Sequence, residues 1–237
     1  MARIQWDKIG ERFYETGIRN CALFVRKSNG DYNHGVAWNG LTTVVESPKG
    51  SEASELYADD IKYVTLRSAE NFEATIEAYT YPDEFIPCEG IVYPIPGVLL
   101  GQQPRREFSV CYVTTLGNDV DYNDYAYKLH IVYNCTSSPS EKDYQTTDDS
   151  PDAILFSWSI TSIPVLVEGY KPTSVIVLDS SKISPYDISV IEDILYGTEN
   201  NDPTLLMPDE IVQIIGTGFL SDEETDYILI GGDRICV

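Results

Sequence analysis

The chain has 237 residues, of which 43% are apolar and 23% charged, so it is long enough for a domain with an apolar core that needs no disulfide or metal. Its 16 basic and 38 acidic side chains give a formal charge of −22, which argues against binding to nucleic-acid phosphates, because such binding requires clustered Lys and Arg. No apolar run could span a bilayer, and the first residues carry Lys, Arg and Glu where a signal peptide is apolar, so we expect assembly in the cytosol without membrane contact.

Alternating apolar and polar residues predict many half-buried strands. The clearest alternation lies at residues 72–79, where one face carries Phe72, Ala74, Ile76 and Ala78 and the other carries Glu73, Thr75 and Glu77. Further strands are expected at residues 21–26, 36–43, 61–67, 108–115, 125–135, 154–160, 174–178, 211–215 and 227–230. Many short strands separated by Gly, Pro and Asn predict a mainly β fold of the sandwich or barrel type.

One α-helix is predicted after residue 183. Ser184 is expected to cap it, Pro185 to occupy its first turn and Gly197 to end it. Its buried face would be formed by three apolar residues at helical spacing, Ile188, Ile191 and Leu195. The segment around Trp6 and Ile9 is expected to be an arm or a short helix, because Gly10 weakens its helical spacing.

Charge and composition suggest a division near residue 168. Residues 1–140 carry 12 basic and 19 acidic side chains, whereas residues 141–237 carry 4 and 19. We expect a β domain with an N-terminal arm at residues 1–168, and an acidic strand–helix–strand segment at residues 169–237. Packing of this segment on the same domain and its exposure on the outside both remain open. Polar stretches at residues 45–60 and 136–152 are expected to be long loops, which are often functional.

Motifs for catalysis or metal binding are absent from the sequence: there is no phosphate-binding loop, zinc-protease motif or serine-hydrolase elbow. The five cysteines are widely spaced and are expected to be buried, reduced thiols. An oxygen-rich loop at residues 118–124 is similar to a calcium loop but has Asp124 where Gly is required, so we expect a hairpin loop of Asx turns, with a calcium site as the alternative. We expect no catalytic, cofactor or metal site.

Five longer runs, in order along the chain, carry a family resemblance. They are GVAWNGLTTVVESPKG from residue 35, LYADDIKYVTL from residue 56, ATIEAYTYPDEF from residue 74, GQQPRREFSVCY from residue 101 and YKLHIVYNCTSSPSEKDY from residue 127. Together they resemble the tail tube (major tail) proteins of long-tailed, siphovirus-like bacteriophages. The resemblance covers roughly residues 1–210 of the sequence.

The resemblance implies a non-enzymatic virion protein that polymerises as stacked hexameric rings. In that family the strands of each ring join into a continuous inner β-barrel, and the tube is the conduit for DNA ejection. The implied partners are further copies of the chain, a tape measure protein, tail terminator and baseplate or tail-tip proteins, and tail assembly chaperones. DNA would pass through the tube without specific binding, and no cofactor is implied.

Two sets of residues are candidates for the tube's function. In the family a long loop between strands reaches the adjacent ring, and the loop at residues 45–60 matches it by position. Its candidate ring-stacking residues are Glu46, Ser47, Pro48, Lys49, Gly50, Ser51, Glu52, Glu55, Asp59 and Asp60. The candidate lumen residues are Glu73, Thr75 and Glu77, because inward carboxylates would keep DNA from adhering to the bore.

Two other classes of function fit the composition. An acidic, Tyr-rich β-sandwich could be a carbohydrate- or protein-binding module on the tail surface, which predicts a monomer with a discrete ligand. A carboxylate-dependent hydrolase predicts activity that is lost when one pair of acidic residues is changed.

Overall fold

The computed structural model describes residues 3–50, 53–144, 146, 153–218, 227–230 and 233–236, and the surroundings of side chains as far as residue 216.

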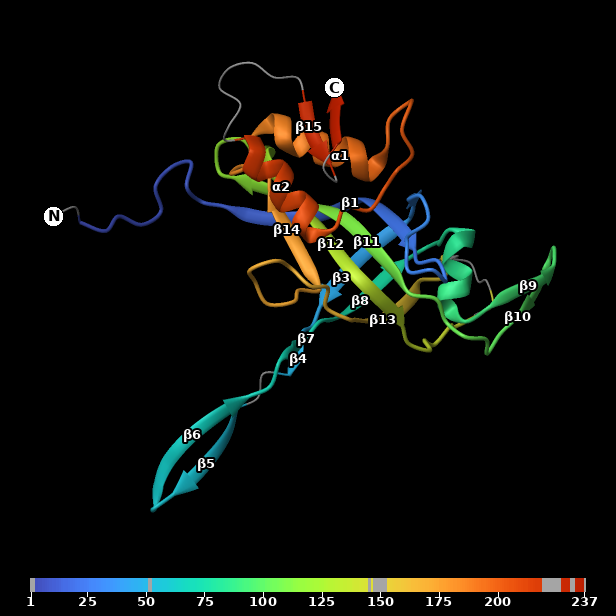
Figure 1. The fold of residues 1–237 in the computed structure, drawn as a ribbon, viewed down its shortest axis with the longest axis horizontal. Coiled ribbons are helices and arrows are strands. Elements are labelled where there is room, and N and C mark those ends of the chain that lie inside the picture. Colours follow the sequence, from blue (N-terminus) through green and yellow to red (C-terminus); the bar gives the residue numbers. More distant parts are fainter. Residues whose placement is uncertain are drawn as a thin grey trace.

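Two long strands form the middle of the main sheet. β11 (Phe108–Asn118) and β12 (Tyr122–Ser137) are antiparallel neighbours. The strand order around them is β2 (Val36–Ala37), β1 (Tyr14–Val25), β11, β12, β13 (Phe156–Ser162), β8 (Glu73–Ala78) and β3 (Leu41–Glu46), with β14 (Val175–Asp179) paired to β12 (Figure 1).

The sheet curves around an aromatic core. β1 and β8 are separated by three strands, yet both contribute side chains to the same buried cluster. At its centre the ring of Trp38 lies 4.5 Å from that of Phe85 and 5.4 Å from that of Trp158, in the tilted and edge-on arrangements that aromatic pairs favour. The mainly β prediction is confirmed, with antiparallel pairing throughout this sheet. The described strands do not close into a barrel, because the strand order ends at β2 and β3.

Two helices cover the outer face of β1, β11, β12 and β14 (Figure 1). α1 (Pro185–Tyr196) and α2 (Pro208–Gly218) bury apolar side chains against Leu129, Ile131 and Tyr133 of β12. Residues 169–218 thus supply one strand and two helices to the same body, while the proposed division at residue 168 stays a prediction. Within the part of the chain that the structure describes, neither helix is both long and apolar enough to cross a membrane.

The predicted helix is confirmed at α1. The Ser184 side chain accepts a hydrogen bond from the backbone N–H of Tyr186, at 3.3 Å, and Gly197 follows the last helical residue. Its three predicted apolar residues are buried.

The prediction of a single α-helix is wrong, because residues 211–215 are helical and not a strand. Pro208 opens α2, and the Glu210 side chain accepts a hydrogen bond from the N–H of Met207 at 2.7 Å. Ile211 and Ile214 then face the sheet at helical spacing.

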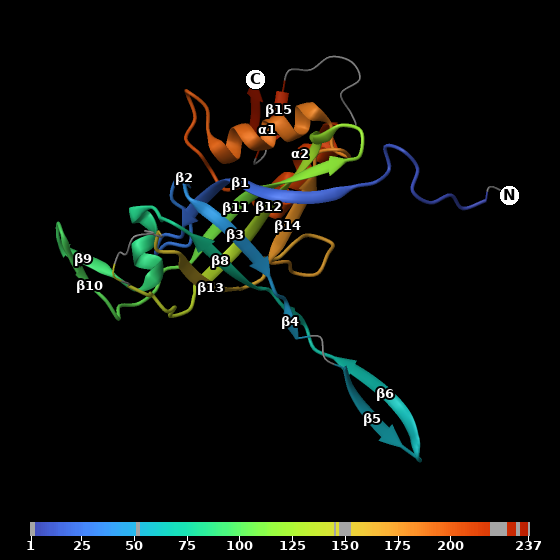
Figure 2. The ribbon, with the colours of Figure 1, turned by 180° about the vertical axis from the view of Figure 1, so that it is seen from behind.

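Three hairpins lie outside the main sheet in the described part of the chain. The longest consists of β4 (Lys49–Gly50) with β7 (Glu70–Asn71) and, beyond them, β5 (Ala53–Ala58) with β6 (Ile61–Arg67). A second, β9 (Val92–Ile95) with β10 (Val98–Leu100), follows the 3₁₀ helix η1 (Asp83–Glu89), and a third pairs β15 (Tyr227–Ile230) with β16 (Asp233–Cys236). Figures 1 and 2 show the first two pointing in different directions, and residues 3–13 extending as an arm without a helix.

The prediction of a long loop without secondary structure at residues 45–60 is therefore wrong. These residues contain the end of β3, β4 and β5, which pair with β8, β7 and β6. The prediction of a loop at residues 136–152 falls partly outside the described residues.

A buried carboxylate joins η1 to the sheet. The side chain of Glu89 is only 6% exposed and accepts hydrogen bonds from the indole N–H of Trp158, at 2.5 Å, and from Lys142, at 3.0 Å. The ammonium of Lys142 also lies 5.2 Å from the centre of the Tyr81 ring. Because a buried charge is tolerated only when it is paired, these contacts hold the residues around Lys142 against the aromatic core.

We predict that Glu89→Ala lowers the free energy of unfolding by about 2–4 kcal/mol, because it leaves the Trp158 N–H and the Lys142 ammonium without their acceptor. Urea unfolding followed by tryptophan fluorescence measures this. The matched control is Glu84→Ala, an exposed residue of the same helix, which should change stability by no more than about 0.5 kcal/mol. Equal effects of the two substitutions would contradict the assigned role of Glu89.

Candidate functional site

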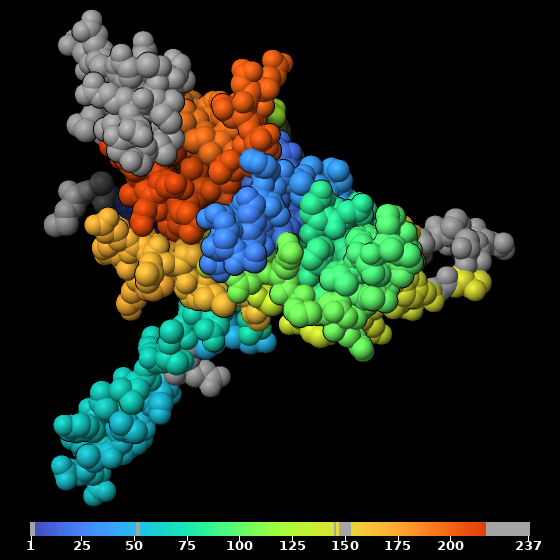
Figure 3. Space-filling view, turned by 45° about the vertical axis from the view of Figure 1, so that its right-hand side comes forward, coloured from blue at the N-terminus to red at the C-terminus, as the bar shows by residue number. Residues whose placement is uncertain are grey.

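The long hairpin stands clear of the body of the molecule (Figure 3). A two-residue turn closes its outer end, where Asp59 and Asp60 have φ of 52° and 61°. Positive φ at both central residues is typical of the type I′ turn, whose twist matches that of the flanking strands. Every residue of β5 and β6 is exposed, so neither strand contributes a buried side chain to the core of the subunit.

The two faces of this hairpin differ in chemistry. On one face Leu56 pairs with Val64, and Ser54 pairs with Leu66. The side chain of Leu56 is 46% exposed, that of Val64 38% and that of Leu66 53%. We call these three residues the apolar face. On the other face, Glu55 accepts hydrogen bonds from Tyr57, at 2.8 Å, and from Lys62. An isolated two-stranded hairpin is at best marginally stable in water, and exposed apolar side chains that lie together are typical of an interaction surface.

The root of the hairpin is held by a polar cluster inside the end of the curved sheet. Glu46, the last residue of β3, accepts a hydrogen bond from the Tyr112 hydroxyl. The His130 ring stacks on Tyr112 with centroids 4.8 Å apart, its Nε2 lies 3.0 Å from the Thr114 hydroxyl, and its Nδ1 lies 3.6 Å from Glu46. Among the described residues, this buried Nδ1 has no hydrogen-bond partner.

This cluster keeps the Glu46 carboxylate charged. The contact with the His130 imidazole is the main cause that lowers the pKa of Glu46, and the Tyr112 hydroxyl contributes in the same direction, against the effect of partial burial. The Glu46 carboxylate of β3 thus contacts Tyr112 of β11 and His130 of β12 at the point where the hairpin leaves the sheet. These contacts restrict the direction in which the hairpin points.

A second set of contacts lies just beyond Glu46. The Ser47 N–H donates to the carbonyl of Glu73 at 2.7 Å, and the Lys49 ammonium lies 2.6 Å from the Glu73 carboxylate. The Glu73 side chain is 29% exposed and that of Lys49 69% exposed, so solvent weakens this ion pair. The pairing of β4 with β7 continues the ladder outward from these contacts.

The structure distributes the ten candidate stacking residues over the length of the hairpin. Glu46 points into the polar cluster, and Ser47, Pro48, Lys49 and Gly50 form the stem. Glu55 lies on the charged face, and Asp59 and Asp60 form the turn. Ser51 and Glu52 lie outside the described residues. The candidates thus miss the apolar face, whose residues lie between the stem and the turn and were passed over because only polar residues were chosen.

The candidate lumen residues share one face of β8. Glu73, Thr75 and Glu77 are half-buried and alternate with residues that are buried in the aromatic core. Their neighbours across the ladders are also mostly polar, with Ser159 of β13 opposite Thr75 and Thr43 of β3 opposite Glu77. The outer face of β3, β8 and β13 is therefore polar, unlike the face that the helices cover.

The oxygen-rich loop at residues 118–124 uses its side chains within the molecule. The Asn118 side chain accepts hydrogen bonds from the N–H of Val120 and of Asp121, as in an Asx turn, and Asp119 accepts one from the N–H of Gly10 at 3.0 Å. Among the described residues, no three His, Cys, Asp or Glu side chains come together to hold a metal ion. The loop anchors the N-terminal arm.

The cysteines that the structure describes are buried free thiols, as predicted: Cys21, Cys88, Cys111 and Cys135. Burial raises the pKa of the Cys111 thiol to about 12, which leaves it protonated and unreactive. Cys236 lies outside the described side chains.

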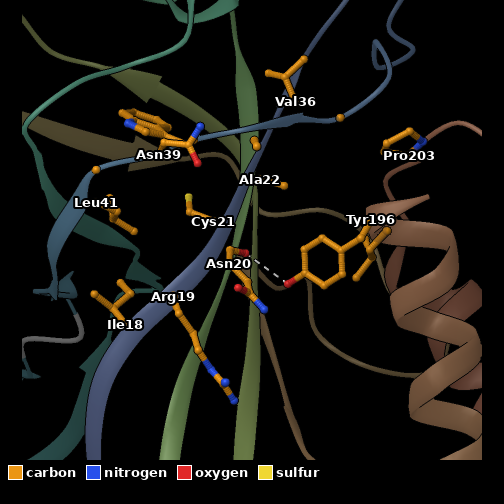
Figure 4. A pocket seen from close by; sticks show the side chains of 15 residues that line it. Ile18, Arg19, Asn20, Cys21, Ala22, Val36, Asn39, Leu41, Tyr196 and Pro203 are labelled. Atoms are coloured by element: carbon orange, nitrogen blue, oxygen red, sulfur yellow. Dashed lines mark hydrogen bonds between the residues drawn. The ribbon is translucent and has the colours of Figure 1, made fainter. Parts of the chain in front are cut away.

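A pocket of about 460 Å³ lies between β1, β2 and the end of α1 (Figure 4). The Tyr196 hydroxyl crosses it and donates a hydrogen bond to the carbonyl of Asn20 at 3.2 Å. Among the described residues that line it, Arg19 is the one charged side chain, and there is no Asp, Glu or His.

Comparison with known proteins gives distant likenesses only. No family model and no curated protein matches the chain. A chain of the anti-feeding prophage baseplate is similar with a TM-score of 0.32 and 9% identity, over 76% of this chain and 100% of that chain. A chain of the anti-feeding prophage tube-terminating cap gives 0.31 and 11% identity, over 76% and 96%.

A chain of the sheath–tube complex of an extracellular contractile injection system, PVC, gives a TM-score of 0.27 and 13% identity, over 74% of this chain and 94% of that chain. These scores are low, and the likenesses carry no argument about what this chain binds or assembles with.

We predict a pH-dependent contribution of Glu46 to stability. Since its pKa is lower in the folded chain than the unfolded value of about 4.3, the carboxylate stabilises the fold above that pH, and the contribution is lost as the pH falls through the folded pKa. Glu46→Gln should therefore reduce the free energy of unfolding most near about pH 6 and least near about pH 3. Urea unfolding of both proteins across this range measures the difference, and a deficit that is constant with pH would contradict it.

Proposed function

We propose that this chain is the structural subunit of a phage-type tail tube, in which copies form hexameric rings that stack around a DNA channel. The observation that carries the proposal is the long hairpin, which leaves the body with an apolar face that nothing in the subunit covers. The sequence resemblance to siphovirus-like tail tube proteins implies the same arrangement, with the hairpin reaching the adjacent ring.

Unpaired strand edges support association within a ring. Among the described ladders, β14 pairs with β12 alone and β3 pairs with β8 alone, so each has one edge of free backbone donors and acceptors. Val177, in the middle of β14, is 45% exposed. Edges of this kind promote aggregation unless they are covered, and pairing between neighbouring copies in a closed ring covers them.

The polar face of β8 suits the bore of such a tube. Glu73, Thr75 and Glu77 lie on a sheet face without helices, and in a ring with this face inward the carboxylates would repel DNA phosphates. The tape measure protein, terminator, baseplate or tail-tip proteins and assembly chaperones are the partners that this role implies. No cofactor or catalysis is required.

The hairpin is tested by replacing residues 51–69 with Asn-Gly, which joins Gly50 to its ladder partner Glu70 through a two-residue turn. We expect the wild type to form stacked rings or tubes in negative-stain images, and the shortened chain to remain in single rings or monomers. Its free energy of unfolding should stay within about 1 kcal/mol of the wild type, because the replaced residues that the structure describes, 53–69, are all exposed. Long tubes from the shortened chain would refute the stacking role.

The lumen is tested with Thr75→Lys/Glu77→Lys, which leaves the Lys49–Glu73 ion pair intact. Particles that carry this variant should eject DNA several-fold more slowly, because cations facing the bore bind phosphates. The control is Asp193→Lys/Glu199→Lys, at two exposed positions in and just after α1. If both variants eject DNA at the wild-type rate, the polar face of β8 lies outside the bore.

A further inference from the structure

We infer that the partner of the apolar face is the β9–β10 hairpin of another copy of the chain, so that the two hairpins are complementary halves of one head-to-tail contact. The inference rests on the proposed function, because it names what the long hairpin touches in the assembled tube.

The β9–β10 hairpin is a second uncovered apolar surface. Its exposed apolar side chains are Val92, Tyr93, Ile95, Val98, Leu99 and Leu100, which are between 39% and 61% exposed. The hairpin is two-stranded, with register partners Val98–Ile95 and Leu100–Val92, and neither strand pairs with another described strand. Like the long hairpin, it buries little in the free subunit and requires a partner surface.

Charge indicates that this partner is another copy. The subunit carries −22, so two copies repel each other unless they meet where acidic side chains are absent. No charged residue stands between Glu89 and Arg105, a stretch that contains the whole of β9 and β10. The apolar face is likewise formed by uncharged side chains, because Glu55 and Lys62 lie on the opposite face of the long hairpin. Cores of protein interfaces are depleted of charge in the same way.

Geometry makes the contact intermolecular. The two hairpins leave the body in different directions, so they do not cover each other within one subunit (Figures 1 and 2). A contact between two different patches of the same chain is heterologous, and it repeats from copy to copy instead of closing in a symmetric dimer. Such a contact generates the rings or stacks that a tube requires.

The two apolar patches are small, so a single contact between them would be too weak to hold two subunits together outside the assembled tube. The apolar face has three side chains and the β9–β10 hairpin has six, whereas a standard stable interface uses about 20–30 residues a side. One contact is therefore weak, and many simultaneous contacts between stacked rings make it effective.

Charge substitutions test the pairing. Leu66→Glu on the long hairpin and Leu99→Lys on β10 each bury an unpaired charge in the contact, and each should raise the concentration needed for tube formation at least about tenfold. When the two variants are mixed, the mutated patches can meet as Glu and Lys and the unchanged patches can meet as in the wild type, so tubes should return. Sedimentation velocity and negative-stain imaging measure both effects.

Matched controls are Thr65→Glu, at an exposed position on the charged face beside Leu66, and Gln102→Lys, just beyond β10. Both should assemble like the wild type, and thermal unfolding should show all variants folded. Wild-type assembly of Leu99→Lys, or failure of the mixture to restore tubes, overturns the pairing while the tube proposal stands on the wild type and the hairpin replacement. If the wild type forms no tubes, the proposed function itself fails.

Discussion

The ladder between β3 and β8 is the pairing on which the functional geometry depends. Val44 of β3 packs against the aromatic core and Ile76 of β8 is buried within it, and the same two strands continue outward as the stem of the long hairpin. An antiparallel ladder fixes the register of its strands, so the buried core sets the direction in which an unburied hairpin points. Glu46 adds a polar restraint where core burial ends, through its contacts with Tyr112 and His130.

The sequence predicted the parts of the fold in which burial is one-sided. β8, a strand with one buried face, alternates cleanly, and α1 has both a cap and an apolar stripe. Residues 211–215 show the limit of this method, because Ile211 and Ile215 fit an alternating strand as well as a helix. Only the neighbouring residues decide between a strand and a helix. Pro208 precedes the segment as the first residue of a helix, and Ile214 lies one helical turn after Ile211 and is buried with it.

The candidate site was harder to predict because it is exposed. β5 and β6 have no buried face in the subunit, so their alternation separates an apolar face from a charged face and gives no sign of a core. The turn at Asp59 and Asp60 lacks the Gly that usually marks a hairpin. The inward direction of Glu46 depends on a register shift between Leu41 and Thr43, and a one-residue shift of this kind moves a side chain to the other face of a sheet.

The acidity of the chain and the proposed assembly are compatible because they concern different parts of the surface. Residues 141–237 carry 19 acidic and 4 basic side chains, whereas the two apolar hairpins lie between residues 53 and 100. Dissolved salt screens the repulsion between copies but leaves the burial of apolar side chains largely intact. Ionic strength should therefore favour contact between copies, whereas it weakens any contact between protein cations and DNA phosphates. The proposed tube would thus hold together under conditions in which DNA adheres least to its surface.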